Sequence, residues 1–216
     1  DDAWVEVQRE FGTPTDGLLR IELTGLQSDA VYSIIGQHSE GRSRVSRFRT
    51  ALGSDDWRIV TFGASSCLGG NVPWPSLSRA AEEQYDFFML LGDSVYTNST
   101  TVENAWQDWW QVLGIRGMAE LTASTSLIAT WDDHELVNNF DWSLIDNAAT
   151  IHANGLACFH RAMPNRINDV GGIYRSVKHG EVLEVFVLDC RGERRSDEGI
   201  YIAEDQMNWL KNALST

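Results

Sequence analysis

The chain has 216 residues, of which 43% are hydrophobic, and it carries a formal net charge of −14 at pH 7. This length suffices for one good hydrophobic core and a small second module. The acidic balance argues against a nucleic-acid backbone or an anionic membrane as partner. It does not argue against a small phosphate substrate, because a local metal charge can outweigh the global field.

The first part of the chain carries a β pattern. Residues 19–23 and 44–50 alternate between apolar and polar side chains, and an apolar run at 31–35 lies between them. Alternation of this kind is typical of half-buried strands, so we expect about three strands before residue 53.

Leu26 is followed six residues later by Tyr32, a spacing that resembles the tyrosine corner of fibronectin-type sandwiches. A complete sandwich needs roughly seven strands. We therefore expect residues 1–53 to be the rear part of a fibronectin-III-like β-sandwich whose start is missing, followed by a linker at 53–56.

From Trp57 onward the pattern changes to strands that alternate with helices. Thr100 and Glu103 fit a capping box before one of these helices, and Trp106, Trp109 and Trp110 fit its core-facing stripe. We predict an α/β sheet covered on both faces over residues 57–216. The expected strands are 58–62, 85–91, 126–131 and 183–188, and the expected helices are 76–84, 102–113, 147–161 and 204–214.

Polar side chains follow each expected strand at its carboxyl end. In α/β sheets, ligands collect outside this edge. Carboxylates beside a histidine are typical ligands of hard or borderline cations, and without a cation so many carboxylates would repel one another. The sequence therefore predicts a metal site, formed in chain order by Ser65-Ser66-Cys67, Gly92-Asp93, Asp132-Asp133-His134-Glu135, and Asp189 with Arg191.

Three segments around these residues resemble the PhoD-like alkaline phosphatase and phosphodiesterase family of the metallophosphatase superfamily. Residues 62–67 resemble its F-x-S-C segment, and residues 85–96 its D-x-x-x-x-x-G-D-x-x-Y block. Residues 130–139 are close to T-W-D-D-H-E-x-x-N-N, the most specific of the three. Three further segments follow the family order: Met163-Pro164, 188–191 and 206–210.

The resemblance implies a catalytic domain of the metallophosphatase α+β sandwich type over residues 57–216. It also implies a centre of Fe³⁺ and Ca²⁺, with other divalent metals as alternatives, that hydrolyses phosphate esters by a metal-activated hydroxide. Carried over residue by residue, Cys67 and Tyr96 bind the iron and Asp93 bridges the two metals.

The resemblance implies that Asn138, or a member of Asp132, Asp133 and His134, binds or orients at the calcium ion. Which of the four residues contacts metal stays open. The wider metallophosphatase pattern has an Asn-His pair where Asp133 and His134 fall, with the histidine stabilising the transition state. Arg191 is a candidate phosphate clamp, because a guanidinium binds phosphate bidentately, but it also fits a structural ion pair.

One feature departs from the family. Its centre is completed by a later Asp-x-His pair, and none follows Leu214, so we expect the chain to be incomplete. An alternative is an inactive or truncated relative that acts as a binding module. A third hypothesis is an unrelated hydrolase with a serine nucleophile and His134, but no G-x-S-x-G elbow occurs.

The expected partner is a small phosphate ester, and no stretch approaches the length of a membrane span. The resemblance implies a secreted, periplasmic or cell-surface protein. No charged-then-apolar leader opens the chain, so we expect a signal peptide to be absent or already removed. The three cysteines, an odd number, do not indicate in which cellular compartment the protein works. The oligomeric state stays open.

Overall fold

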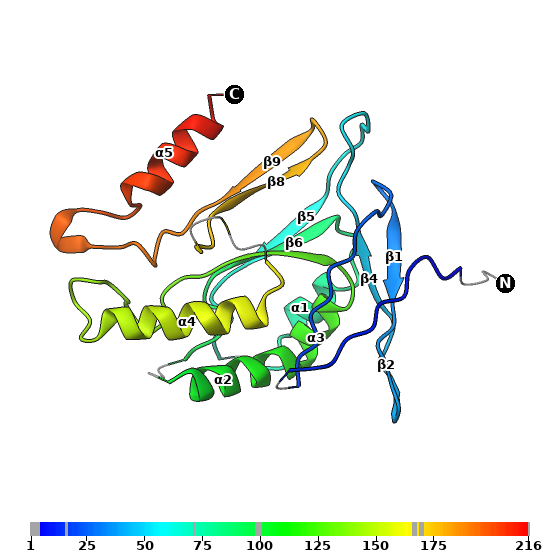
Figure 1. Ribbon diagram of the computed structural model, residues 1–216, viewed down its shortest axis with the longest axis horizontal. Coiled ribbons are helices and arrows are strands. Elements are labelled where there is room, and N and C mark those ends of the chain that lie inside the picture. Colours follow the sequence, from blue (N-terminus) through cyan, green and yellow to red (C-terminus); the bar gives the residue numbers. More distant parts are fainter. Residues whose placement is uncertain are drawn as a thin grey trace.

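The computed structural model describes residues 5–15, 17–70, 72–97, 101–165, 168 and 171–215. No helix in this described part combines the length and the apolar character needed to cross a lipid bilayer. The elements, shown in Figure 1, are β1 (Val31–Ile34), β2 (Gln37–His38), β3 (Gly41–Arg42), β4 (Ser46–Arg49), β5 (Phe62–Ser65), α1 (Pro75–Ala80), β6 (Phe87–Leu91), α2 (Val102–Gly114), α3 (Arg116–Thr122), β7 (Ser126–Thr130), α4 (Ala148–Ala162), β8 (Arg175–His179), β9 (Leu183–Val187), the 3₁₀ turn η1 (Ser196–Glu198) and α5 (Glu204–Ala213).

A three-stranded parallel sheet in the order β5-β6-β7 forms the centre of the molecule. In the register, Phe62 lies beside Phe87, which in turn pairs with Ser126. The middle strand β6 is a continuous apolar run, and its Phe87 and Leu90 are fully buried. Because neighbouring side chains of a strand point to opposite faces, this run needs cover on both faces of the sheet.

Helices α1 to α4 cover one face (Figure 1), and their core contains Phe88, Leu90, Trp109 and Met118. Gly117 allows α3 to lie close to the segment before α1, since an added Cβ would come within 2.8 Å of the main-chain oxygen of Pro73. The helical layer is thus held together by close backbone contact as well as by apolar burial.

The antiparallel hairpin β8–β9 covers the other face, where Phe87, Ile128 and Val187 form a second core. Helix α5 lies beyond the hairpin (Figure 1), and its Trp209 ring is 6.1 Å from that of Phe186. The expected strand at 183–188 exists, but it pairs with β8, which the sequence did not predict, and not with the parallel sheet.

The N-terminal part forms two small antiparallel pairs, β1 with β4 and β2 with β3. The expected strand at 19–23 is wrong: these residues form no strand, and the Leu19 side chain is 45% exposed. An alternating pattern stabilises a strand only where a partner strand is present. Tyr32 fits the expected corner, because its hydroxyl accepts a hydrogen bond from the N–H of Gln27 at 2.9 Å.

Charged side chains join this N-terminal part to the central sheet. Arg58 donates through Nη1 to Asp86 Oδ2 at 2.9 Å and through Nε to Asp29 Oδ1 at 2.9 Å. The main-chain N–H of Gly180, in the β8–β9 turn, donates to Leu52 at 3.0 Å. Residues 53–56, expected to be a linker, form a turn that is closed by a hydrogen bond of 2.8 Å from the Gly53 N–H to the Asp56 carboxylate.

Several expected boundaries shift. The first strand of the sheet begins at Phe62 and not at residue 58, helix α1 ends at Ala80, and α3 was not predicted. Thr100 lies outside the described residues, and the cap of α2 is Thr101, whose side chain accepts from the N–H of Asn104.

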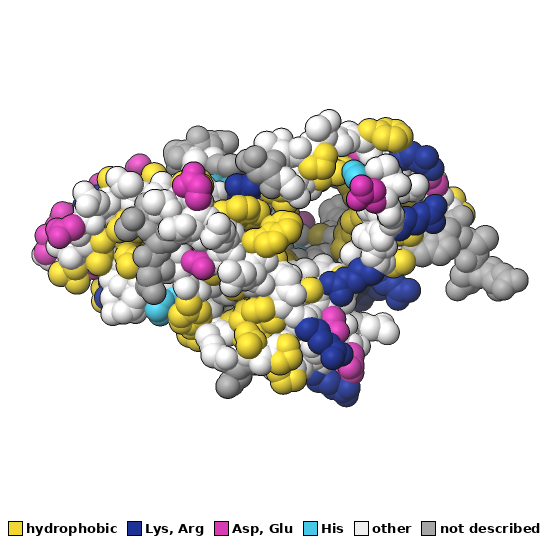
Figure 2. Space-filling model, turned by 90° about the horizontal axis from the view of Figure 1, so that it is seen from below, with side chains coloured by type: hydrophobic (Ala, Val, Ile, Leu, Met, Phe, Trp, Pro, Cys, Tyr) yellow, Lys and Arg dark blue, Asp and Glu magenta, His cyan; other side chains and the backbone are white. Residues whose placement is uncertain are grey.

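The prediction that the tryptophans of α2 form a core-facing stripe is only partly correct. Trp109 is fully buried, but Trp110 is 57% exposed because it lies about 100° further round the helix. On the face shown in Figure 2, Lys and Arg side chains gather at the end of the molecule that holds the N-terminal strands.

Candidate metal centre

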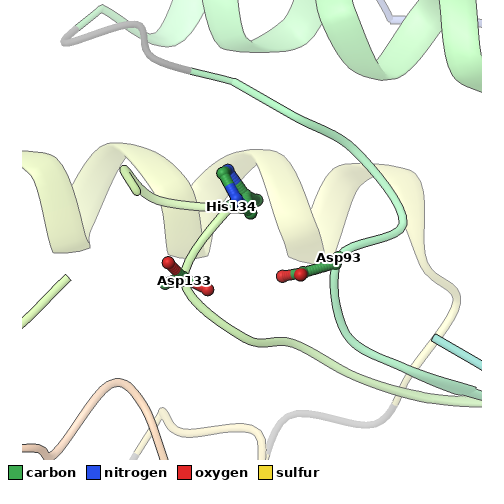
Figure 3. A group of neighbouring side chains, drawn as sticks. All are labelled: Asp93, Asp133 and His134. Atoms are coloured by element: carbon green, nitrogen blue, oxygen red, sulfur yellow. The ribbon is translucent and has the colours of Figure 1, made fainter. Parts of the chain in front are cut away.

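Two loops that follow neighbouring parallel strands meet at the carboxyl edge of the sheet. The loop after β6 carries Asp93, and the loop after β7 carries Asp133 and His134. One potential ligand atom from each of the three side chains lies within 4.8 Å of the other two. Figure 3 shows the two carboxylates pointing toward each other, with the imidazole beside them. This is the group of side chains expected at this edge of the sheet.

Backbone geometry brings the two loops this close. Gly92 has φ +101°, a value that side chains other than glycine rarely adopt, and an added Cβ would lie 2.6 Å from the main-chain nitrogen of Asp132. Asp93 itself has φ 55°, in the left-handed region. Asp93 is thus held in an uncommon conformation at the point where its side chain meets the second loop.

Within the part of the chain that the structure describes, two buried atoms of this cluster have no hydrogen-bond partner, namely Asp93 Oδ1 and His134 Nδ1. Buried polar atoms are normally paired, and an orphaned one needs an explanation such as an ion. Asp133 is also buried, and its Oδ2 accepts a hydrogen bond from the N–H of Asn139. An unpaired carboxylate oxygen and an unpaired imidazole nitrogen on neighbouring side chains fit a bound cation.

The loop after β5 adds Cys67 to the same place. Its Sγ lies 3.4 Å from Asp93 Oδ2, and the neighbouring N–H of Leu68 donates to the main-chain oxygen of Asp93 at 2.9 Å. The Tyr96 ring lies 4.2 Å from that of His134, centroid to centroid. The structure therefore brings Cys67, Asp93, Tyr96, Asp133 and His134 together.

The thiol and the phenol are both surrounded by negative charge. Burial, with the charge of Asp93 and Cys67, raises the pKa of Tyr96. A hydrogen bond to Ser66 lowers the pKa of Cys67, but hydrogen bonding to Asp93, burial and nearby carboxylates outweigh it and raise this pKa. Deprotonation of either group at neutral pH thus needs a cation beside it.

Arg191 is largely buried and lies at the edge of the cluster. Its Nε donates to Asp132 Oδ1 at 2.6 Å, and its Nη2 lies 3.9 Å from Asp133 Oδ1. Asp132 is thus held by Arg191 at the rim of the site. Asn138, the remaining candidate ligand, is exposed, so its expected role as a calcium ligand stays a prediction.

Glu135 ends the Asp132-Asp133-His134-Glu135 segment that the sequence predicts at the site, but no role of its own was predicted for it. It is fully buried, and its carboxylate accepts hydrogen bonds from the main-chain N–H groups of Asp93, Ser94 and Asp132. Burial raises the pKa of Glu135 to about 7 although these donors oppose the shift. The sequence places Glu135 within the predicted metal-site segment, but its burial and its three N–H donors arise only in the folded chain.

A buried hydrogen-bond network joins the site to helix α5. Trp131 Nε1 donates to Asp189 Oδ1 at 2.7 Å, and the same oxygen accepts from the N–H of Gly192 at 2.6 Å. Gln206 of α5 accepts from the N–H of Asp189 at 2.8 Å and donates to its main-chain oxygen at 3.1 Å. The loop that carries Arg191 is thus fixed between β7 and α5.

Comparison with known proteins gives two kinds of match. Residues 112–216 match the family of PhoD-like phosphatases. Among solved structures, PhoD superposes with a TM-score of 0.77 and 20% identity, over 87% of this chain and 45% of PhoD. A purple acid phosphatase from seeds of yellow lupin (Lupinus luteus) superposes with a TM-score of 0.60 and 14% identity, over 90% of this chain and 35% of that chain.

These two likenesses establish the mixed α/β fold, and at such identities they establish the fold alone. The chain spans less than half the length of either phosphatase. No curated protein matches the sequence.

Proposed function

We infer that this chain, whose residues 112–216 match the family of PhoD-like phosphatases, takes part in the hydrolysis of phosphate esters with the help of metal ions. The observation that carries this inference is the cluster of Asp93, Asp133 and His134, in which two buried ligand atoms have no partner among the described residues. The family match includes the loop of Asp133 and His134, and the likeness to the fold of PhoD covers 87% of the chain.

We propose that Asp93, Asp133 and His134 hold the metal, with Cys67 and Tyr96 adding ligands for Fe³⁺, and Asp132 or Asn138 adding oxygens for Ca²⁺. Thiolate and phenolate suit iron, and carboxylate and amide oxygens suit calcium. A cation bound there would lower the pKa of water and neutralise the charge of the phosphate.

The chain's own groups then position the substrate. His134, whose Nδ1 is unpaired, can take either of two roles: metal ligand or donor to an oxygen of the phosphate. Arg191 supplies a fixed positive charge beside Asp132 and Asp133, which favours an anionic ester over a neutral one.

We also propose an arrangement of two domains. Residues 57–216 are assigned to the catalytic domain, and residues 1–53 to part of a fibronectin-III-like module. The hydrogen bond between Tyr32 and Gln27 supports the second assignment. A location outside the cytoplasm is proposed on the family resemblance.

The test combines metal analysis with hydrolysis of 4-nitrophenyl phosphate and bis(4-nitrophenyl) phosphate. The chain, purified without chelators, should hold metal, and Asp93→Asn should lose it while far-UV circular dichroism stays unchanged. Asp55→Asn, which removes the same charge from an exposed turn, is the matched control and should keep the metal. Full metal occupancy in Asp93→Asn would contradict the assignment, and a metal-free but hydrolytic wild type would contradict metal dependence.

A further inference from the structure

Glu135 occupies an unusual position for an acidic residue, because it is fully buried directly behind the metal site. Burying a carboxylate is costly unless hydrogen bonds compensate it. The partners of Glu135 that offset this cost are main-chain N–H groups.

These N–H groups come from two different loops. Glu135 Oε2 accepts from the N–H of Asp93 and from the N–H of Asp132, each at 3.0 Å, and Oε1 accepts from the N–H of Ser94 at 2.6 Å. One carboxylate therefore ties the loop after β6 to the loop after β7. These are the two loops whose side chains form the candidate metal cluster (Figure 3).

The first of these donors belongs to a candidate ligand itself. Asp93 has φ 55°, which side chains other than glycine rarely adopt, so its local backbone preference does not keep it in place. Two hydrogen bonds hold its main chain: the Asp93 N–H donates to Glu135, and the Asp93 oxygen accepts from the N–H of Leu68. The Glu135 side of the contact is also anchored, because a Cβ on Gly155 of α4 would lie only 3.2 Å from the Glu135 main-chain oxygen.

We propose that Glu135 is a positioning residue that sets the metal affinity of the site by holding the two ligand loops at a fixed separation. The inference rests on the proposed function, since it assumes that Asp93, Asp133 and His134 bind a cation. Groups that orient metal ligands from behind typically change affinity 10- to 100-fold when they are altered.

The experiment is a calorimetric titration of the metal-free chain with Mn²⁺. Glu135→Gln keeps the shape of the side chain but has one acceptor oxygen, so its amide group must face at least one N–H donor. We expect Mn²⁺ to bind this variant about 10- to 100-fold more weakly than wild type, with an unchanged near-UV circular dichroism spectrum. Glu83→Gln is the matched control, because exposed Glu83 precedes the opposite end of β6 and should leave affinity unchanged.

A wild-type Mn²⁺ affinity in folded Glu135→Gln would overturn the proposal. If that variant does not fold, Glu135→Asp is titrated instead; it keeps the charge but is one methylene too short to reach both loops, so wild-type affinity there would overturn the proposal equally. A readout that needs no metal is amide hydrogen exchange at Asp93, Ser94 and Asp132, which should speed up in the variant. Failure of wild type to bind Mn²⁺ would count against the proposed function, whereas unchanged exchange at the three amides would count against Glu135.

Discussion

Replacing Gln206 by alanine should destabilise the protein markedly, although Gln206 lies on a helix outside the sheet. The side chain is fully buried. It makes two hydrogen bonds to the main chain of Asp189 and a third, at 2.6 Å, to Glu193 Oε2. Alanine removes all three and leaves the buried N–H and C=O of Asp189 without these partners.

The magnitude follows from the unpaired groups. Each buried polar group left without a partner costs about 1–3 kcal/mol. With two such main-chain groups, and with the Glu193 carboxylate keeping its bond from the N–H of Ala203, we expect a loss of about 3 kcal/mol in the free energy of unfolding. This is a large share of the roughly 5–15 kcal/mol that stabilises a typical protein.

Urea unfolding, followed by tryptophan fluorescence, measures this loss as a lower midpoint at constant slope. Asn208→Ala is the matched control, because Asn208 is exposed on the same helix and its replacement should change stability by less than about 0.5 kcal/mol. A Gln206→Ala variant as stable as this control would refute the argument that α5 is fixed through Asp189.

Three further predictions concern the metal site, the helical layer and acid stability. Cys67→Ser should lower iron content more than calcium content, because thiolate favours iron; equal metal contents by elemental analysis would make Cys67 a structural residue. Gly117→Ala should cost about 1–3 kcal/mol in thermal unfolding, because its Cβ would press on the main chain before α1, whereas Gly114→Ala, where the added Cβ meets nothing within 4 Å, should not destabilise the protein. Burial alone would raise the pKa of Asp141, but hydrogen bonds from two serines lower it to about 2. The ionised Asp141 carboxylate therefore adds about 2 kcal/mol to the free energy of unfolding. This stabilisation is present above the unfolded pKa near 4 and is lost as the pH falls toward 2. Asp141→Asn should lower stability at pH 7 and match wild type at pH 2, and an equal deficit at both pH values would contradict the assignment.

The sequence predicted the elements that carry the site because their signals are local. An unbroken apolar run marks β6, and a 3.6-residue apolar period with polar flanks marks α4 and α5. Residue types at strand ends, such as Asp93 and His134, are visible in the sequence, and parallel strands bring their carboxyl ends to one edge. The resemblance to PhoD-like phosphatases is confirmed over residues 112–216.

Only the tertiary structure shows which predicted strands have partner strands and which polar side chains have hydrogen-bond partners. Residues 19–23 alternate as a strand would but have no neighbouring strand, and β9 pairs with β8 and not with the central sheet. Glu135 is one acidic residue among several in the sequence, and only the approach of two loops gives it three N–H donors. Periodicity and composition depend on neighbours along the chain, whereas strand pairing, burial and the pairing of polar groups depend on residues far apart in sequence, and their free energies exist only once the chain has folded.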